Sequence, residues 1–456
     1  METFFRRTRI NAPAEEVFRW HTRPGAVERL TPPWESVEII ARHGGVENGA
    51  IVVLRMGLGP LSQYWVAEHR DYQEGRQFCD VQVSGPFAHW VHTHRFEPDG
   101  PSACYLEDHI EYALPLGPMG RLTGGAFVRH KLERMFTYRH RIMSEDMTTH
   151  ARYTGTSMKI LVSGASGLVG TALVSFLTTG GHTVTCLVRS QPRTGVNAIL
   201  WDPERGVHDP ASLEGFDAVV HLAGENLIGR WTTNKRTRIR DSRVTGTKTL
   251  CDTLARLSSP PKVIISASAV GYYGDRGVEV LTEESPAGQG FLAGVCQAWE
   301  EATLSAVQRN IRVVTARIGI VLSPAGGALA QMLLPFRLGL GGVIDSGEQY
   351  VSWVSLDDVI GAIHHLLFTD TLRGPVNVTA PQPVTNRQFA VTLGRVLGRP
   401  TLLPVPARVV RIALGEMANE LLLSGARVEP QRLQEVHYSF RYPELEGALR
   451  YMLGRA

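Results

Sequence analysis

The sequence predicts an α/β protein whose main part is a doubly wound parallel sheet, preceded by an α+β region and followed by a small, mostly helical region. Three observations support this prediction. Before about residue 155, short segments alternate apolar and polar positions between Gly, Pro and Asp turns, as antiparallel strands do. After residue 158, nearly continuous Val/Ile/Leu segments alternate with helical ones, which is typical of a parallel sheet buried on both faces. From about residue 399, short helices and loops prevail.

The composition is that of an ordinary globular protein. The chain has 456 residues, of which 43% are hydrophobic and 20% charged, so it is long enough for several domains and too apolar for a disordered chain. The formal net charge of +3 lacks the basic excess of a general nucleic-acid binder. No apolar run approaches the roughly 20 residues that span a bilayer, and residues 1–13 lack the apolar core of a signal peptide. We therefore expect a cytoplasmic protein without a membrane span.

Residues 1–152 are predicted to form the α+β domain. A helix is expected near residues 14–20, and a longer one over about 125–145 closes the region. A curved antiparallel sheet packed on the last helix buries the apolar faces of both. The expected strands are residues 36–40, 51–55, 77–83, 88–96 and 103–112.

The doubly wound domain is expected over residues 158–398, after a short polar linker at 153–157. Residues 399–456 are expected to form the small C-terminal domain, with helical segments over 406–424 and 429–433. The predicted parallel strands of the doubly wound domain are residues 159–163, 183–188, 218–222, 262–267 and 312–318.

The strongest functional signal is a glycine turn between the first strand and the first helix of this domain. Gly164, Gly167 and Gly170 have the spacing GxxGxxG. The first glycine permits a tight turn, the second lets the backbone approach a pyrophosphate, and the third lets the helix pack closely on the strand. The N-terminus of that helix offers unpaired N–H groups to the phosphates. This pattern predicts a dinucleotide site.

Arg189 follows the second predicted strand, where an NAD-preferring protein usually has an acidic residue. A guanidinium at this position suits a 2′-phosphate. We therefore expect NADP(H) as the cofactor; the alternative is a solvated arginine at the end of a strand.

These segments resemble the extended short-chain dehydrogenase/reductases, which have a Rossmann fold. Arg317-Ile-Gly-Ile-Val-Leu and Trp353-Val-Ser-Leu-Asp357-Asp358-Val resemble two further blocks of that superfamily, the second of them at a helix N-terminus. The resemblance implies cofactor contacts from the following residues: Gly164, Ser166, Gly167, Leu168, Gly170, Arg189, Leu222, Ala223, Gly224, Ala267 and Ser268.

Two further segments, residues 266–275 and 291–300, resemble one subfamily of these proteins. Its members are usually labelled epimerase-family protein, nucleoside-diphosphate-sugar epimerase or SulA-type protein, and many have a small C-terminal domain of unknown function. Residues 400–450 are similar to that domain, with Leu403-Pro-Val-Pro406 and the aromatic residues Tyr438, Phe440 and Tyr442.

The catalytic pattern of the superfamily is incomplete. Short-chain dehydrogenases use Ser or Thr together with Tyr-x-x-x-Lys on a helix. Counting back from Glu300 places Cys296 in the lysine position and Leu292 in the tyrosine position, whereas Ser268 matches the serine. Tyr272 or Tyr273 is a candidate replacement for the tyrosine, and Cys296 is a candidate acid or nucleophile if its pKa is lowered. Packing roles are the alternative for all three, and Glu225 is a further candidate acid or a surface carboxylate.

The first domain resembles the START-like polyketide cyclase/dehydrase superfamily, whose helix-grip fold encloses a cavity for hydrophobic ligands. The resembling segments are Ile10-Asn-Ala-Pro13-Ala-Glu-Glu-Val-Phe18-Arg-Trp20-His21, His94-Arg-Phe96 and Leu106-Glu-Asp108-His-Ile-Glu-Tyr112-Ala-Leu-Pro115-Leu-Gly117.

Three histidines, His89, His92 and His94, occur close together in this domain. On a strand, His92 and His94 share a face with Trp90 and Phe96. Two histidines on one face without a third ligand do not make a metal site, so we expect cavity-lining or surface roles. The five scattered cysteines form no CxxC pair, and no zinc site is expected from them.

Two functions remain open on this reading. The first is an NADP-dependent oxidoreductase or nucleoside-diphosphate-sugar epimerase with a modified active site and a small-molecule substrate. If that substrate is apolar, the first domain would present it to the nicotinamide of the second domain. The second is a non-catalytic NADPH sensor or hydrophobic-ligand binding protein, which the missing Tyr–Lys pair favours.

Overall fold

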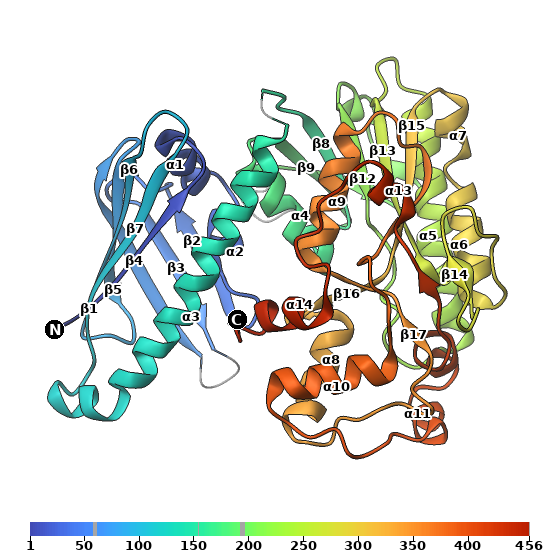
Figure 1. The fold of residues 1–456 in the computed structure, drawn as a ribbon. Coiled ribbons are helices and arrows are strands. Elements are labelled where there is room, and N and C mark those ends of the chain that lie inside the picture. Colours follow the sequence, from blue (N-terminus) through green and yellow to red (C-terminus); the bar gives the residue numbers. More distant parts are fainter. Residues whose placement is uncertain (58–61, 154, 192–196, 456) are drawn as a thin grey trace. The chain divides into compact units, whose positions relative to one another are not determined.

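The computed structural model describes residues 1–57, 62–153, 155–191 and 197–455. The chain divides into two compact units (Figure 1). The first unit is formed mainly by Met1–Thr156 and the second by most of the residues from Ser157 on. Thr154, which falls in the expected linker, lies outside the described residues.

The first unit is built on a seven-stranded antiparallel sheet with the order β1-β7-β6-β5-β4-β3-β2. Two of its strands, β1 and β4, were not predicted, since charged residues interrupt their apolar pattern. In β1 these charges are paired on the exposed face, where Arg7 contacts Glu97 at 3.0 Å and Arg9 contacts Asp99 at 2.7 Å. The strands are β1 (Glu2–Ile10), β2 (Val37–His43), β3 (Ile51–Met56), β4 (Gln63–Gln73), β5 (Gln77–Ser84), β6 (His89–Pro98) and β7 (Cys104–Ala113).

One long helix, α3 (Pro118–Ala151), packs along this sheet (Figure 1). It is longer than the predicted residues 125–145, and Pro118 stands in its first turn, where the missing N–H of proline costs no hydrogen bond. Leu132 and Phe136 of the helix pack against Trp90, Ile110 and Tyr112 of the sheet. Two shorter helices, α1 (Ala14–Thr22) and α2 (Ala26–Leu30), complete the unit. This is the α+β arrangement that the sequence predicts.

The second unit is a Rossmann-type α/β structure around an eight-stranded sheet with the order β11-β10-β9-β8-β12-β13-β15-β19. Its neighbouring strands are parallel except for β10 and β11. The strands are β8 (Lys159–Ser163), β9 (Thr183–Val188), β10 (Ala198–Asp202), β11 (Gly206–Val207), β12 (Ala218–His221), β13 (Val263–Ala269), β15 (Arg312–Ile318) and β19 (Gly374–Val378).

Helices of this unit alternate with its strands, as in a doubly wound fold. The central strands bury Ile160, Val162, Val220, Ile265 and Val314 in one apolar core. The helices are α4 (Leu168–Thr179), α5 (Thr233–Ala255), α6 (Phe291–Glu301), α7 (Leu304–Gln308), α8 (Gly327–Arg337), α9 (Leu356–Phe368), α10 (Asn386–Leu397), α11 (Ala407–Leu414), α12 (Glu416–Ala418), α13 (Gln431–Glu435) and α14 (Leu445–Met452).

Short strand pairs extend the second unit away from its main sheet. They are β14 (Val280–Leu281) with β21 (Arg427–Val428), β16 (Ile320–Ser323) with β18 (Trp353–Ser355), and β17 (Tyr350–Val351) with β20 (Val384–Thr385). Among the described residues, no helix has the length and apolarity needed to cross a membrane.

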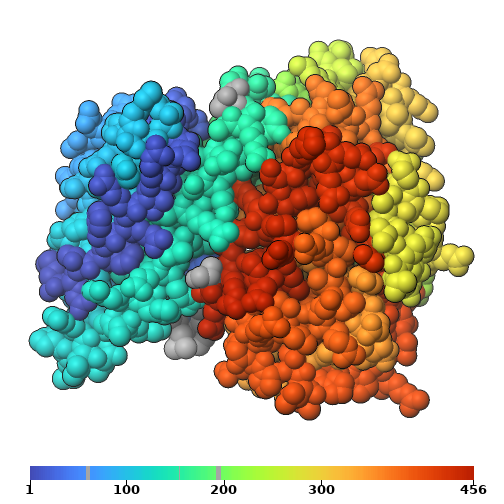
Figure 2. Space-filling model, in the orientation of Figure 1, coloured from blue at the N-terminus to red at the C-terminus, as the bar shows by residue number. Residues whose placement is uncertain are grey.

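Residues 405–451 are packed into the second unit, where they appear in red among the orange segments of its surface (Figure 2). Leu433 and Tyr438 belong to the same apolar core as the central strands. Asp358, at the N-terminus of α9, accepts hydrogen bonds from the backbone N–H groups of Arg441 at 2.6 Å and Tyr442 at 3.1 Å. The expected helix-terminal role of Asp358 therefore extends to holding the C-terminal segment.

Candidate functional site

The candidate site lies at the carboxyl ends of β8, β9, β12 and β13, which are neighbouring parallel strands in the order β9-β8-β12-β13. Ligands of open α/β sheets bind at this edge, where the order of strands reverses. The glycine turn follows β8, Arg189 follows β9, Leu222–Gly224 follow β12, and Ser268 lies near the end of β13. The structure thus brings all the residues expected at the cofactor to one edge of the sheet.

The glycine turn has no room for side chains at two of its three glycines. Gly164 has a φ of 72°, and a Cβ there would lie 2.7 Å from the carbonyl carbon of Leu222. A Cβ on Gly170 would lie 2.1 Å from the carbonyl oxygen of Gly164. The first glycine therefore permits the left-handed turn, and the third lets α4 approach β8 closely, as the sequence predicts.

The middle glycine, Gly167, is different, because a side chain there would meet a single backbone atom. A Cβ on Gly167 would meet only the carbonyl oxygen of Gly164, at 3.3 Å, and both Ser166 and Gly167 are exposed. Next to them, α4 begins at Leu168, so its first backbone N–H groups point toward this surface. Exposed glycine backbone beside a helix N-terminus is the geometry that accepts a pyrophosphate, and the turn therefore fits a dinucleotide.

Arg189 is exposed directly after β9 and has no hydrogen bond or ion pair with another described residue. Residues 192–196, which follow it, lie outside the described residues. A guanidinium without a carboxylate partner is available for a phosphate, and it can bind one through two parallel hydrogen bonds.

A partly buried arginine that the sequence analysis did not single out, Arg243, lies against Gly224. The Arg243 guanidinium, from α5, is 3.2 Å from the position that a Cβ of Gly224 would occupy. Its Nη1 donates to the carbonyl oxygens of Glu225 at 3.0 Å and Ile239 at 3.1 Å, and its Cζ lies 5.1 Å from the ring centre of Trp299. Burial lowers the pKa of Arg243, with Cys296 and Glu225 as the nearest counteracting groups. Only the fold reveals this proximity, since Arg243 lies far from the glycine turn in the sequence.

Glu225 does not have the properties of a catalytic acid. Its Oε1 accepts a hydrogen bond from Lys235 at 2.7 Å, and this bond lowers the pKa of the Glu225 carboxyl. It is an ion-paired carboxylate near the surface, as the alternative interpretation held.

Ser268 is buried and belongs to a chain of polar contacts behind the sheet edge. Its hydroxyl donates to Oε1 of Glu300 at 2.7 Å. The same carboxylate accepts two hydrogen bonds of 2.8 Å from Nε and Nη2 of Arg317. Sequence analysis matched Ser268 to a catalytic serine but did not anticipate that Glu300 and Arg317 hold its hydroxyl. This bidentate ion pair fixes the orientation of Ser268.

The two tyrosines after β13 have different environments. Tyr273 is fully buried; its hydroxyl donates to Oδ1 of Asn377 at 2.7 Å and accepts from Nη1 of Arg317 at 3.0 Å. Burial raises the pKa of Tyr273 to about 12. Tyr272 is partly exposed, with the Arg317 guanidinium carbon 3.5 Å from its ring centre. Tyr273 is thus a packed structural residue in this conformation, and Tyr272 alone of the pair has exposed surface.

The thiol pKa of Cys296 is not lowered, as a reactive role would require. The side chain is 3% exposed on α6, and burial raises the pKa of its thiol to about 12. A thiol with a raised pKa is a weak nucleophile at neutral pH. Leu292, one turn earlier, is buried in an apolar cluster with Trp231 and Ile239. These two positions therefore contribute packing, and the small-hydrophobe interpretation of Cys296 agrees with the structure.

Three known families match successive parts of the chain. Residues 10–137 match the family described as "Polyketide cyclase / dehydrase and lipid transport". Residues 160–378 match the "NAD dependent epimerase/dehydratase family", and residues 405–452 match a domain of unknown function. The resemblances identified in the sequence are confirmed.

Curated and solved proteins extend these matches. An epimerase family protein of Mycobacterium bovis is 43% identical over 297 residues, which is 65% of this chain and 98% of that protein. The crystal structure of a nucleoside-diphosphate sugar epimerase from Corynebacterium glutamicum is 33% identical and covers 99% of this chain and 90% of its own, with a TM-score of 0.81. The structure of human epimerase family protein SDR39U1 with NADPH is 36% identical and covers 65% of this chain and 99% of its own, with a TM-score of 0.60. The glycine turn, the parallel sheet and these similarities together establish that the chain belongs to the NAD dependent epimerase/dehydratase family.

Proposed function

We propose that the second unit binds NADP(H) and acts as an oxidoreductase or nucleoside-diphosphate-sugar epimerase with an atypical active site. The observation that carries the cofactor choice is Arg189, an exposed guanidinium at the end of β9 that has no carboxylate partner within the part of the chain that the structure describes. The human relative SDR39U1 was solved with NADPH, which supports the same choice.

The residues that would hold the cofactor follow from the sheet edge. The backbone of Ser166, Gly167 and Leu168 would face the pyrophosphate, and Arg189 would bind the 2′-phosphate. The backbone of Leu222–Gly224 and of Ala267 would flank the nucleotide, because these residues end the neighbouring strands β12 and β13. When bound, the nicotinamide supplies hydride transfer.

Arg243 is our candidate for the positive charge that a lysine provides in other short-chain dehydrogenases. Its guanidinium lies beside Gly224, and Cys296 is among the groups that act on its pKa. Cys296 occupies the expected lysine position, so Arg243 brings a permanent charge to the same neighbourhood from a different helix.

Tyr272 is our candidate for the group nearest the substrate, and Ser268, which is buried behind the sheet edge, is our candidate for a positioning residue. Ser268 is oriented by Glu300, and Tyr272 keeps exposed surface while Arg317 covers one face of its ring. Tyr273 and Cys296 have no such access and are not part of this proposal.

A second candidate function is NADPH binding without turnover, as in a sensor or a hydrophobic-ligand binding protein. The observation that favours it is the burial of Tyr273 and Cys296, which leaves Tyr272 as the single candidate proton donor among the replacements considered. The match of residues 10–137 to a lipid-transport family supports a small-molecule ligand in the first unit.

Calorimetric titration of the full chain with NADPH and then NADH tests the cofactor proposal. We expect tighter binding of NADPH, and loss of that preference in Arg189→Asp, because the aspartate repels the 2′-phosphate. Arg309→Asp is the matched control: this exposed arginine lies before β15, at the opposite edge of the sheet, and carries the same change of charge. Equal affinities of the wild type for both nucleotides would overturn the role of Arg189.

Single-turnover measurements then separate the two functions. Nucleotide sugars are screened with NADP⁺ bound, because oxidation of a sugar hydroxyl transfers a hydride to the oxidised nicotinamide, and apolar carbonyl compounds are screened with NADPH bound, because their reduction takes a hydride from it. Both reactions are followed by the change in nicotinamide absorbance. Turnover that falls in Tyr272→Phe and in Ser268→Ala, with unchanged NADPH affinity, is expected of the enzyme. Tight binding with no turnover of any compound by the wild type would favour the sensor.

A further inference from the structure

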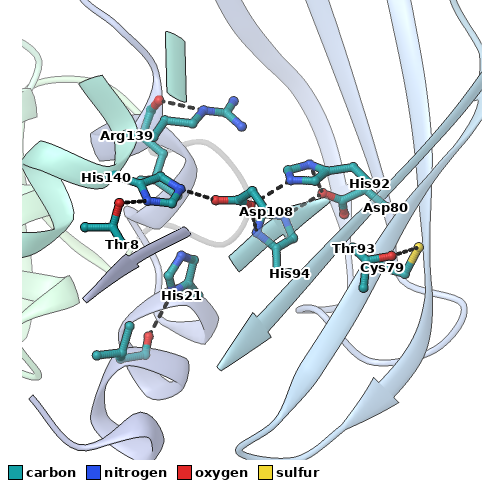
Figure 3. A network of polar contacts seen from close by, with 12 residues as sticks. Thr8, His21, Cys79, Asp80, His92, Thr93, His94, Asp108, Arg139 and His140 are labelled. Atoms are coloured by element: carbon teal, nitrogen blue, oxygen red, sulfur yellow. Dashed lines mark hydrogen bonds and ion pairs between the residues drawn. The ribbon is translucent and has the colours of Figure 1, made fainter. Parts of the chain in front are cut away.

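The interior of the first unit contains a cluster of histidines and aspartates that the proposed function does not use. Asp80, His92, His94 and Asp108 come from the adjacent strands β5, β6 and β7, and His140 reaches them from α3 (Figure 3). The register aligns these residues, because Asp80 pairs with His92 and His94 pairs with Asp108 across neighbouring strands. His92, His94, Asp108 and His140 are each at most 6% exposed.

Three of these side chains converge on one point. Oδ2 of Asp80 lies 3.7 Å from Nδ1 of His92 and 3.3 Å from Nε2 of His94. All three ligand atoms lie within 4.8 Å of one another. Two ligand atoms that are each about 2.1 Å from a metal ion lie about 3.0 to 3.6 Å apart at angles of roughly 90 to 120°, and about 3.7 Å apart at a slightly wider angle. The distances from Asp80 to the two histidines are therefore those of ligands around a common ion.

Each histidine turns its other nitrogen toward a second carboxylate. Nε2 of His92 lies 2.7 Å from Oδ1 of Asp108, and Nδ1 of His94 lies 2.7 Å from the same oxygen. The other oxygen of Asp108 is held by Nε2 of His140 at 2.5 Å, and Nδ1 of His140 contacts the hydroxyl of Thr8 at 2.8 Å. Histidines that bind metals commonly have a carboxylate on their outer nitrogen, which fixes the ring and its tautomer. Asp108 has this position for both rings.

The first carboxylate is oriented in a similar way. Oδ1 of Asp80 lies 2.9 Å from Nε2 of His69, a residue of β4, so Oδ2 remains directed at His92 and His94. The Asp80 side chain is 24% exposed, whereas the His92 and His94 side chains are at most 8% exposed. Asp80 is therefore the most exposed of the three proposed ligands.

Hydrogen bonding alone does not account for this cluster. His94 Nδ1 is buried and has no hydrogen-bond partner, since its 2.7 Å contact with Asp108 lacks hydrogen-bond geometry. Oδ1 of Asp80 is likewise buried without a partner of good geometry. Buried polar atoms normally have such partners. These two atoms are the outer atoms of the proposed ligands, which face Asp108 and His69, whereas the inner atoms, Oδ2 of Asp80 and Nε2 of His94, lie 3.3 Å apart in a hydrogen bond. The cluster also places two carboxylates in the interior, where negative charges require compensation.

We propose that Asp80, His92 and His94 bind a divalent transition-metal ion of the zinc type, with Asp108 and His140 positioning the two histidines. Two imidazoles and one carboxylate suit Zn²⁺, Fe²⁺ and Co²⁺, and three protein ligands leave a position for water or a ligand atom. Asp80, on the neighbouring strand β5, faces both histidines and is the candidate third ligand that the sequence analysis did not identify. The first unit would then hold its small-molecule ligand with an ion as well as with apolar side chains.

The test uses the full chain with its metals removed by chelation. Titration calorimetry with Zn²⁺ is expected to show about one tight site per chain, and Co²⁺ is expected to give the visible absorption bands of a low-symmetry nitrogen–oxygen site. His94→Ala removes a ligand, and Asp80→Asn keeps the shape of the carboxylate while removing its charge. Each is expected to weaken Zn²⁺ binding at least tenfold and to abolish the Co²⁺ bands.

His109→Ala is the matched control, because His109 neighbours Asp108 on β7 and points to the other, more exposed face of the sheet. It is expected to bind both ions as the wild type does. Far-UV circular dichroism of every variant shows whether the unit is folded. If His94→Ala does not fold, the Asp80→Asn variant tests the proposal alone. The proposal would be overturned if the wild type did not bind Zn²⁺, or if a folded Asp80→Asn variant bound it as tightly as the wild type. Protonated histidines would then be the positive charges that compensate the two carboxylates.

Discussion

Gly170→Ala is the substitution whose effect follows most directly from the geometry of the glycine turn. The added Cβ would lie 2.1 Å from the carbonyl oxygen of Gly164 and 2.8 Å from the Cα of Ala165, whereas ordinary contacts begin near 3.4 Å. Both neighbours are backbone atoms, so α4 must move away from β8 by about 1 Å. Overpacking of this kind costs about 3 kcal/mol, which corresponds to a decrease in Tm of at least about 5 °C.

Gly167→Ala provides the comparison within the same turn. Its Cβ would meet a single atom, the carbonyl oxygen of Gly164 at 3.3 Å, on an exposed surface. We expect a change in stability within about 0.5 kcal/mol. If the pyrophosphate lies on this backbone, the methyl group keeps it away, and the Kd for NADPH rises at least about tenfold, which is about 1.4 kcal/mol.

Thermal unfolding by circular dichroism and calorimetric titration with NADPH measure the two effects separately. The reasoning requires that Gly170→Ala lowers the Tm and that Gly167→Ala lowers the affinity at nearly constant Tm. A Gly170→Ala protein with the Tm of the wild type would refute the packing argument. A Gly167→Ala protein with unchanged affinity would refute the placement of the pyrophosphate.

Three further predictions concern buried groups of the second unit. Arg317→Met leaves Glu300 without its bidentate partner and is expected to destabilise the unit by about 3 kcal/mol in denaturant unfolding, because a lone buried charge is costly; a loss below about 1 kcal/mol would contradict this. Cys296, with its thiol pKa raised to about 12 by burial, is expected to react with iodoacetamide at neutral pH only after unfolding, as mass spectrometry of the intact and denatured chain will show. Burial raises the pKa of Asp358 to about 6, above the roughly 3.9 of an unfolded chain, so the folded state binds this proton more tightly. The wild type therefore loses stability as the pH rises from about 4 to 6, and the Asp358→Asn variant is expected to lose less stability over that range. If the Tm of both proteins changed equally with pH, the assignment to Asp358 would be disproved.

The parts of the fold that could be predicted from sequence are those encoded locally. The strands β8, β9, β12, β13 and β15 are runs of apolar residues, and the glycine turn is a continuous segment with a spacing that has one known geometry. β1 and β4 were not predicted, because their ion-paired charges interrupt the alternation that identifies a strand.

The side-chain clusters could not be predicted, because they depend on register and on packing between elements. Asp80 and His92 are opposite each other only because β5 and β6 pair with that alignment, and a shift by one residue would turn one of them to the other face. Glu300 and Arg317 likewise come from α6 and β15 and meet behind Ser268. Residue spacing carries no information on such contacts.

The attachment of the C-terminal segment has a consequence for how the second unit unfolds. Residues 405–452 match a separate family, yet Leu433 and Tyr438 fill the core of the main sheet and Asp358 binds the backbone of Arg441 and Tyr442. Removal of this segment would expose that core and leave the Asp358 carboxylate without two of its donors, the backbone N–H groups of Arg441 and Tyr442. We therefore expect the Rossmann sheet and the C-terminal segment to form one cooperative unit that melts in a single calorimetric transition. The boundary between the two matched families would then separate two sequence families within one folding unit.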